Sequence, residues 1–175
     1  VLGSQIALQS SYCGFDVTIW LRSEGSIERA KPKLERFKNI YIDTLEKMKT
    51  DASAYCRGLT SKNDLSADEL DELKQKAQKA YDNIKLTTSY EEAASDADLI
   101  IEAIAENPEQ KIAFYTELAK YMEEKTIIVT NSSTVLPSMF AEYTGRPEKY
   151  LALHFANTIW QNNTAEVMGH PGTDL

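Results

Sequence analysis

After Asn83 the sequence alternates between short apolar runs and longer segments with helical periodicity. The apolar runs 98–104, 126–130 and 150–155 are typical of strands that are buried inside a parallel sheet. Asn107 and Pro108 open a helix after the first run, because a capping side chain is followed there by a proline in the first turn. This alternation predicts an α/β fold: a doubly wound, mostly parallel sheet with helices on both faces.

The residues before Asn83 are mainly helical in pattern. Apolar spacing predicts a long helix over about 26–50, in which Pro32 makes a kink or marks the first turn. Ser66 and Glu69 form a capping box for a second helix that runs to about residue 81, and we interpret the pair as a helical hairpin inserted over about 26–82. Three further helices are predicted: one over 1–11 that stops at Gly14, a short one capped by Ser89 and Glu92, and a short one over 137–143. Strands are predicted over 16–21, 84–87 and 165–168.

Polar side chains follow the predicted buried strands, at the edge where such sheets bind ligands. His154 lies at the end of one strand, Asn131–Ser133 directly follow another, and Glu106 and Asn107 follow a third. Taken singly, such residues also have ordinary explanations: His154 could be a satisfied core histidine, the loop 130–134 could cap the next helix, and Glu166 could be a surface strand residue. Their shared position at strand ends favours a functional site.

The first residues resemble the end of a glycine-rich dinucleotide fingerprint. Gly3 would be the third glycine, which lets the helix pack on the preceding strand, and Leu2 and Gly3 would approach the cofactor. The strand 16–21 follows about 15 residues later, as in a Rossmann-type βαβ unit. We expect the first strand and the first two glycines to lie outside this chain.

The residues after strand 16–21 bear on the choice between NAD and NADP. An NAD site usually has a carboxylate at this position to bind the adenosine ribose, whereas this chain has Leu21, Arg22 and Ser23. Arg22 and Ser23 could bind a 2′-phosphate, so NADP is a hypothesis. The alternative is that Arg22 is a surface residue and NAD is used.

Composition excludes several other classes of protein. The formal net charge of −8 argues against a nucleic-acid partner, and no apolar run approaches the length of about 20 residues that spans a bilayer. Cys13 and Cys56 are far apart and match no metal motif, and two histidines cannot build a His-rich site, so no metal is expected. The pattern predicts a cytoplasmic protein with reduced thiols.

The segment 98–168 resembles the L-3-hydroxyacyl-CoA dehydrogenase family, and the Gly3 region is compatible with its NAD-binding domain. The matching pieces are Asp98-Leu99-Ile100-Ile101-Glu102-Ala103-Ile104-Ala105-Glu106-Asn107, Asn131-Ser132-Ser133, Leu153-His154-Phe155-Ala156-Asn157, and Glu166 twelve residues after the histidine. The resemblance implies a dinucleotide-binding domain over 1–175 that takes NAD or NADP.

The resemblance also implies roles for individual residues. His154 would be the acid/base, Glu166 its partner, and Ser133 a hydrogen-bond donor to the substrate oxygen. Other matched positions would support the nicotinamide half of the cofactor and the active-site network: Glu106, Lys111, Asn131 and Asn157. An imidazole can pass a proton in either direction near neutral pH, and a carboxylate on its second nitrogen fixes the tautomer.

The residues after the histidine depart from the pattern of the fatty-acid enzymes, which commonly carry Asn-Pro-x-Pro there. This chain has Asn157-Thr158-Ile159-Trp160-Gln161-Asn162-Asn163-Thr164. It looks more like the bacterial group of 3-hydroxybutyryl-CoA dehydrogenases and diketoreductases, and Trp160 and Asn163 are expected to line the substrate pocket.

The function implied is reversible oxidation of a 3-hydroxyacyl compound, as a CoA ester, to the 3-oxoacyl compound, as in fatty acid metabolism. Alternatives are a reductase of dicarbonyl esters, a dehydrogenase of a hydroxy or sugar acid, and a non-catalytic dinucleotide-binding module. The family has a helical C-terminal domain that forms a homodimer and closes the cleft. We expect that domain to be absent from this chain, and the chain alone to be inactive or nearly so.

Overall fold

The computed structural model describes residues 2–174, so Val1 of the predicted first helix lies outside the described residues. The chain forms two compact units. The first unit contains residues up to 88 together with 156–164, and the second contains 89–155 and the residues from 165 on. No described helix is long and apolar enough to cross a membrane. The two units are described in turn.

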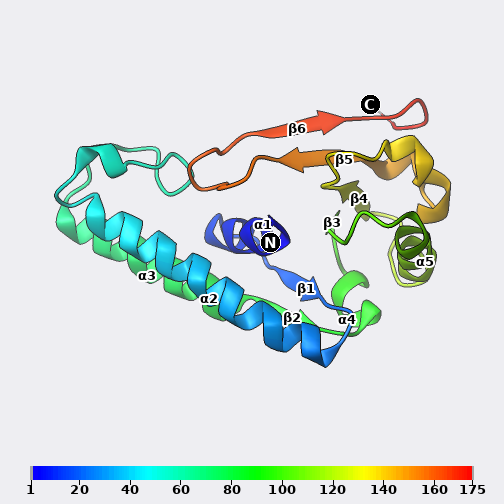
Figure 1. Ribbon diagram of the computed structural model, residues 1–175, viewed down its shortest axis with the longest axis horizontal. Helices are drawn as coiled ribbons and strands as arrows, with labels where there is room; N and C mark the ends of the chain where they lie inside the picture. The colour runs from blue at the N-terminus through cyan, green and yellow to red at the C-terminus, as the bar shows by residue number, and fades with distance from the viewer. Residues whose placement is uncertain (1, 175) are drawn as a thin grey trace. The chain divides into compact units, whose positions relative to one another are not determined.

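The first unit is built around two short parallel strands and three helices (Figure 1). Helix α1 (Leu2–Tyr12) ends before Gly14, whose φ of 96° is readily adopted only without a side chain, as predicted. Strand β1 (Thr18–Trp20) pairs in parallel with β2 (Lys85–Thr87). Parallel strands need a long crossover connection, and here the helical hairpin itself supplies it.

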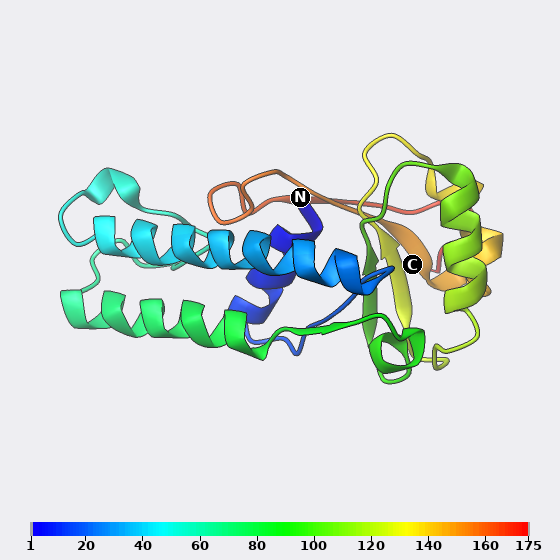
Figure 2. The ribbon, with the colours of Figure 1, turned by 60° about the horizontal axis from the view of Figure 1, so that its bottom comes forward.

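The hairpin consists of α2 (Glu24–Lys47) and α3 (Ala67–Asn83), joined by a loop that contains the short 3-10 helix η1 (Ala52–Ala54). Figures 1 and 2 show the two long helices side by side. The predicted Ser66–Glu69 capping box opens α3. Ion pairs between the helices gather near the loop end, where Lys49 lies 2.7 Å from Asp71 and Lys74 also pairs with Glu46.

Helix α2 begins earlier than the periodicity predicts. Ser23 is its N-cap, since its hydroxyl accepts the backbone N–H of Ser26, which the sequence had suggested as the helix start. Pro32 therefore lies eight residues beyond the first residue of α2, and the expectation that it marks the first turn is wrong. Its ring is on the exposed side of the helix, where the carbonyl left without an N–H partner can bind water.

The core of the first unit is aromatic. Tyr12 packs edge-on against Tyr41 with ring centroids 5.6 Å apart, and Tyr41 also contacts the ring of Trp160 at 5.6 Å. Phe37 lies 5.9 Å from the same tryptophan. The loop 156–164 is thus part of the first unit, although the strands on either side of it belong to the second.

The second unit is a four-stranded sheet in the order β3-β4-β5-β6. Strands β3 (Leu99–Glu102), β4 (Ile127–Thr130) and β5 (Tyr150–Phe155) are parallel, and β6 (Ala165–Met168) runs antiparallel to β5. The hydrogen-bonded ladders therefore form two sheets, one in each unit, instead of the single sheet expected. Two helices accompany this sheet: α4 (Tyr90–Ala94), capped by Ser89 as predicted, and α5 (Pro108–Leu118), capped by Asn107.

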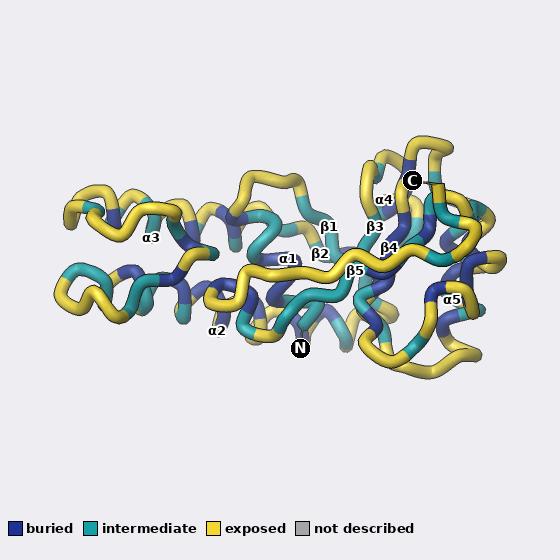
Figure 3. Tube along the Cα trace, turned by 90° about the horizontal axis from the view of Figure 1, so that it is seen from above, coloured by how far each residue is buried: buried dark blue, intermediate teal, exposed yellow. Residues whose placement is uncertain are grey.

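The core of the second unit lies between the sheet and α5, and includes Tyr115, Leu118, Ile128 and Tyr150. The segment predicted as a helix over 137–143 is instead two 3-10 turns, η2 (Pro137–Met139) and η3 (Ala141–Thr144), followed by η4 (Pro147–Lys149). The strands differ in burial. The first residues of β3 and β4 are exposed, and every residue of β6 is exposed (Figure 3).

A substitution at Gly58 tests the anchorage of loop 156–164 within the first unit. A Cβ at this position would lie 2.6 Å from both Cα and the carbonyl oxygen of Trp160, which is backbone that cannot swing away. We expect Gly58→Ala to lower the free energy of unfolding by about 1–3 kcal/mol, measured by chemical denaturation. Gly25→Ala is the control, because its Cβ would meet only side-chain atoms, Nη1 of Arg29 at 3.4 Å and Oγ of Ser23 at 4.0 Å. Equal stability of both variants would contradict the packing described.

Candidate active site

His154 and Glu166 are brought together by the pairing of β5 with β6. The two residues are directly opposite one another in the antiparallel register, and His154 Nδ1 lies 3.2 Å from Glu166 Oε2. The histidine side chain is 30% exposed and the glutamate side chain 73% exposed, so the pair is open to solvent. A carboxylate that accepts the Nδ1–H leaves Nε2 of the ring available to a bound molecule.

The loop after β4 lies beside this pair. Asn131 Oδ1 accepts the backbone N–H of Phe155, the residue after His154, at 2.9 Å. Ser132 is buried and its hydroxyl accepts the N–H groups of Thr134 and Val135, which fixes the turn. Ser133 is exposed between these anchored positions. The structure therefore brings Asn131 and Ser133 to the same edge of the sheet as His154.

Glu102 belongs to the matching motif 98–107, but no role was predicted for it from the sequence. It is the last residue of β3, its side chain is 1% exposed, and Lys111 from α5 donates to both of its oxygens at 2.9 and 2.8 Å. Tyr115 and Thr130 each donate a hydroxyl to Oε2, and the N–H of Ile104 donates to Oε1. The sequence signal was available: a carboxylate that ends an apolar strand needs buried partners.

Two tyrosines extend this network into the core. Burial, and next the Glu102 carboxylate, raise the pKa of Tyr115 far above its ordinary value, and burial raises the pKa of Tyr150 to about 12. Both hydroxyls therefore keep their protons at physiological pH. The Tyr115 hydroxyl has one proton, which it donates to Glu102. In the hydrogen bond of 2.9 Å between the two tyrosine hydroxyls, Tyr150 is therefore the donor and Tyr115 the acceptor.

The same network explains why β3 is shorter than predicted. The sequence indicates a strand up to residue 104, but the N–H of Ile104 bonds to the Glu102 side chain instead of to a neighbouring strand. Glu106, expected at the cofactor, follows in the loop that leads to α5. Lys111 Nζ lies 3.5 Å from Glu106 Oε2, and the Glu106 side chain is 40% exposed. Lys111 is thus buried beneath a partly exposed carboxylate.

The remaining predicted cofactor residues lie in the first unit. Leu2 and Gly3 form the first turn of α1, and Arg22 and Ser23 follow β1. Both Arg22 and Ser23 are exposed, although the Ser23 hydroxyl is engaged as the cap of α2. Arg29, which the sequence analysis did not consider, reaches back to the hydroxyl of Ser26 at 2.9 Å, so a second guanidinium lies at this helix start.

The predicted substrate residues Trp160 and Asn163 and the predicted cofactor residue Asn157 also lie in the first unit, whereas Ser133 lies in the second. Asn157 and Asn163 are exposed, whereas Trp160 is 5% exposed and packs against Phe37 and Tyr41. A ring this buried has little surface to offer a substrate, so its observed role is packing. Thr158 has a positive φ of 54°, and its N–H donates to the buried Gln5 side chain at 2.9 Å, which fixes this loop on α1.

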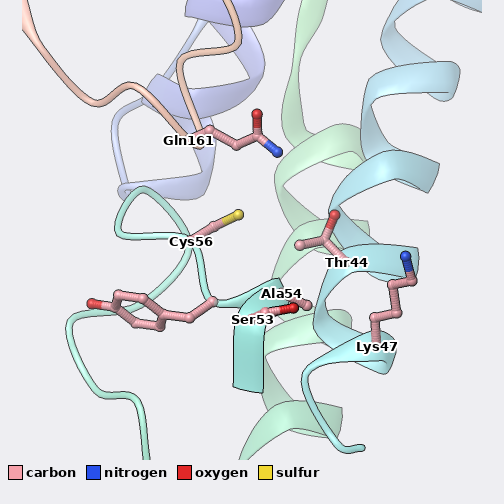
Figure 4. A pocket seen from close by; sticks show the side chains of 7 residues that line it. Thr44, Lys47, Ser53, Ala54, Cys56 and Gln161 are labelled. Carbon is pink, nitrogen blue, oxygen red and sulfur yellow. The ribbon is translucent and has the colours of Figure 1, made fainter. Parts of the chain in front are cut away.

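A polar pocket of about 310 Å³ opens in the first unit, and none of the predicted site residues lines it (Figure 4). It is lined by residues of α2, of the η1 region and of loop 156–164: Thr44, Lys47, Ser53, Ala54, Tyr55, Cys56 and Gln161. Burial raises the pKa of the Cys56 thiol, which disfavours the thiolate that a nucleophile requires. Within residues 2–174 no cluster of side chains could hold a metal ion.

The parallel strands with polar side chains at their carboxyl ends define an α/β domain of the dinucleotide-binding class. The comparison with known families is more specific. The model of the 3-hydroxyacyl-CoA dehydrogenase NAD-binding domain matches residues 1–175, and the chain belongs to this family. The Rossmann-type fold and a nicotinamide cofactor, both predicted from the sequence, are thereby confirmed.

One relative found by sequence and two solved structures are similar to this chain. The fatty acid oxidation complex subunit alpha of Pseudomonas syringae pv. syringae (strain B728a) is 30% identical over 131 residues, which are 75% of this chain and 17% of that protein. A diketoreductase, solved in work on dual catalysis of dicarbonyl compounds, is 41% identical with a TM-score of 0.78, covering 99% of this chain and 53% of that one. The (S)-3-hydroxybutyryl-CoA dehydrogenase of Ralstonia eutropha, at 21% identity and a TM-score of 0.71, shares the fold over 99% of this chain and 52% of its own. The chain thus spans about half the length of these solved relatives, and less of the oxidation complex subunit.

Removal of the Lys111 ammonium tests the buried network. Lys111→Met leaves the Glu102 carboxylate buried without its cation, and we expect the free energy of unfolding to fall by about 3–5 kcal/mol, measured by urea denaturation. Lys120→Met is the matched control, because Lys120 makes a solvent-exposed pair with Glu117 and should change stability little. A Lys111→Met protein as stable as the control would show that Glu102 does not depend on this pair.

Proposed function

We propose that this protein is an NAD(P)-dependent oxidoreductase that reversibly converts a 3-hydroxyacyl compound to the 3-oxoacyl compound. The observation that carries the proposal is the His154–Glu166 pair, held across β5 and β6 at the edge of the sheet where ligands of this fold bind. We further propose that residues 1–175 form one dinucleotide-binding domain with the helical insertion at 26–82. The family assignment and the homologous dehydrogenases support this reading.

The chemistry assigned to His154 is proton transfer at the substrate oxygen. In the reductive direction the Nε2–H gives its proton to that oxygen, and in the oxidative direction Nε2 removes it. Glu166 accepts the Nδ1–H, which fixes the tautomer and stabilises the imidazolium. The Ser133 hydroxyl, exposed in the loop after β4, is proposed to donate a hydrogen bond to the same oxygen.

The donors at the strand ends fit a nicotinamide dinucleotide. Asn131 uses Oδ1 for Phe155, which leaves its amide nitrogen as a donor, while Glu106 offers an acceptor above Lys111. A bound cofactor supplies or accepts the hydride. We assign Leu2, Gly3 and Asn157 to the same binding site on the family pattern, and we propose that Arg22 and Ser23 also admit the 2′-phosphate of NADP.

A second candidate substrate is favoured by one particular comparison. The diketoreductase acts on dicarbonyl compounds and is 41% identical to this chain, whereas the 3-hydroxybutyryl-CoA dehydrogenase is 21% identical. A dicarbonyl ester is therefore the alternative to an acyl-CoA, with Asn163 among the residues of the substrate pocket. We also propose that the working enzyme is a cytoplasmic homodimer that pairs through a further helical domain.

Substitution of His154 tests the proposed reaction. We expect His154→Gln to lower kcat about 10²–10⁴-fold with little change in the Kd for NADH, because an amide cannot carry the proton. The assay uses the full-length protein with NADH or NADPH and either acetoacetyl-CoA or a 3,5-dioxo ester. His170→Gln is the control, since this second imidazole bonds the Pro147 carbonyl away from the strand ends. Unchanged kcat in His154→Gln would eliminate the mechanism, and cofactor binding without turnover of either compound would favour a binding module.

The choice of dinucleotide is tested at Arg22. If its guanidinium binds the 2′-phosphate, Arg22→Ala should weaken NADPH binding about 10-fold and leave NADH binding within a factor of two. Arg36→Ala, on an exposed face in the middle of α2, should change neither affinity. A wild-type enzyme that uses NADH at least ten-fold better than NADPH would refute the NADP hypothesis.

A further inference from the structure

The Glu102 carboxylate has no part in the proton transfer proposed for His154, yet it has more partners than any other buried side chain described here. Its five hydrogen-bond contacts all come from donors: Lys111 twice, Ile104 N–H, and the hydroxyls of Tyr115 and Thr130. Only a carboxylate can accept from all of them, because a neutral amide or acid would place one of its own protons against a donor. The network is therefore specific for a charged group at this position.

One arm of the network leads from Glu102 to the loop before α5. Lys111 is buried and is held by both Glu102 oxygens, so its ammonium cannot move independently of them. The same ammonium is 3.5 Å from the carboxylate of Glu106. The Ile104 N–H bond ties the chain between Glu102 and Glu106 to the same carboxylate. The Lys111–Glu106 ion pair and the Ile104–Glu102 hydrogen bond together fix the position of the partly exposed Glu106 carboxylate.

A second arm leads to the loop after β4. Thr130 donates its hydroxyl to Glu102 and accepts the N–H of Ser132 at 3.2 Å. The backbone carbonyl of Glu102 accepts the N–H of Asn131 at 2.8 Å. Asn131 in turn holds the N–H of Phe155, next to His154. One buried residue thus bonds directly to the loops that follow β3 and β4, and through Asn131 to β5.

We propose that Glu102 is a positioning residue that sets the geometry of the dinucleotide site through Lys111–Glu106 on one side and Asn131–Ser133 on the other. This inference rests on the proposed function for the identity of the ligand. Stability alone does not require the charged pair, since an apolar pair of similar volume commonly stabilises a core equally well. An apolar pair would leave Glu106 and Ile104 without the partners that hold them.

The test is Glu102→Gln, which keeps the shape and removes one acceptor. We expect the NADH Kd, measured by fluorescence titration of the full-length protein, to rise about 10-fold, with KM for the cofactor rising by a similar factor and kcat changing less. In the protein without ligand, amide exchange of residues 103–107 and 131–135 should become about 10-fold faster. Thr126→Val is the matched control, because it also removes a hydrogen bond of a buried hydroxyl, the one from Thr126 to the Ala97 carbonyl. Thr126 directly precedes the first residue of β4, whereas the loop after β4 follows its last.

A double variant separates positioning from a purely structural role. Glu102→Gln combined with Lys111→Met removes both buried charges and should recover part of the melting temperature lost in the single variant. Positioning predicts that the weak NADH binding and the fast amide exchange persist in the double variant. Recovery of both together with stability would overturn the proposal, as would a single variant whose exchange rates and NADH Kd match those of Thr126→Val.

The amide-exchange measurement also distinguishes this inference from the proposed function. If the wild-type protein binds neither NADH nor NADPH, the proposed function fails. Faster exchange in the two loops of Glu102→Gln would still support the positioning role of the carboxylate. If the wild type binds NADH and the variant binds it equally well with unchanged exchange, the positioning role fails and the proposed function stands.

Discussion

A carboxylate buried at the end of a strand imposes the strongest constraint on the second unit. Glu102 must find partners for its charge where no water reaches it, and the partners come from three directions: Lys111 and Tyr115 on α5, Thr130 on β4, and its own loop at Ile104. Each partner fixes one element relative to the sheet. The helix, the neighbouring strand and the loop between them are thereby held in one arrangement, in which polar groups that remain exposed lie at the same edge.

The His154–Glu166 pair, which we propose to be catalytic, depends on a different constraint, the register of two strands. Glu166 lies opposite His154 because β6 runs antiparallel to β5, and a shift by one residue would turn the carboxylate to the other face of the sheet. The chain between the two residues leaves the second unit and packs in the first, where Trp160 is buried beside Phe37 and Tyr41. The segment expected to shape a substrate pocket therefore also contributes to the core of the first unit.

Local sequence patterns gave the elements and most of the cap residues. The Ser66–Glu69 capping box, the Asn107 cap and the stop at Gly14 are found as predicted, because each depends on side chains within a few residues of the chain. Two predicted elements differ from the structure. Residues 137–143 form 3-10 turns instead of one helix, and β3 ends early because the Glu102 side chain, which is held by α5 and β4, accepts the backbone N–H of Ile104.

By itself the sequence determined the alternation of strands and helices, and the family motif that identifies His154, Glu166 and Ser133 as the residues to examine. These depend on residue type and spacing, which a single chain displays directly. Only the tertiary structure decided that Glu166 pairs with Nδ1 of His154, that Trp160 is buried, and that Glu102 bonds to the loops that follow β3 and β4. Each of these results from contacts between residues that are distant in the chain, and hydrogen bonding and burial at such contacts exist only once the strands have paired.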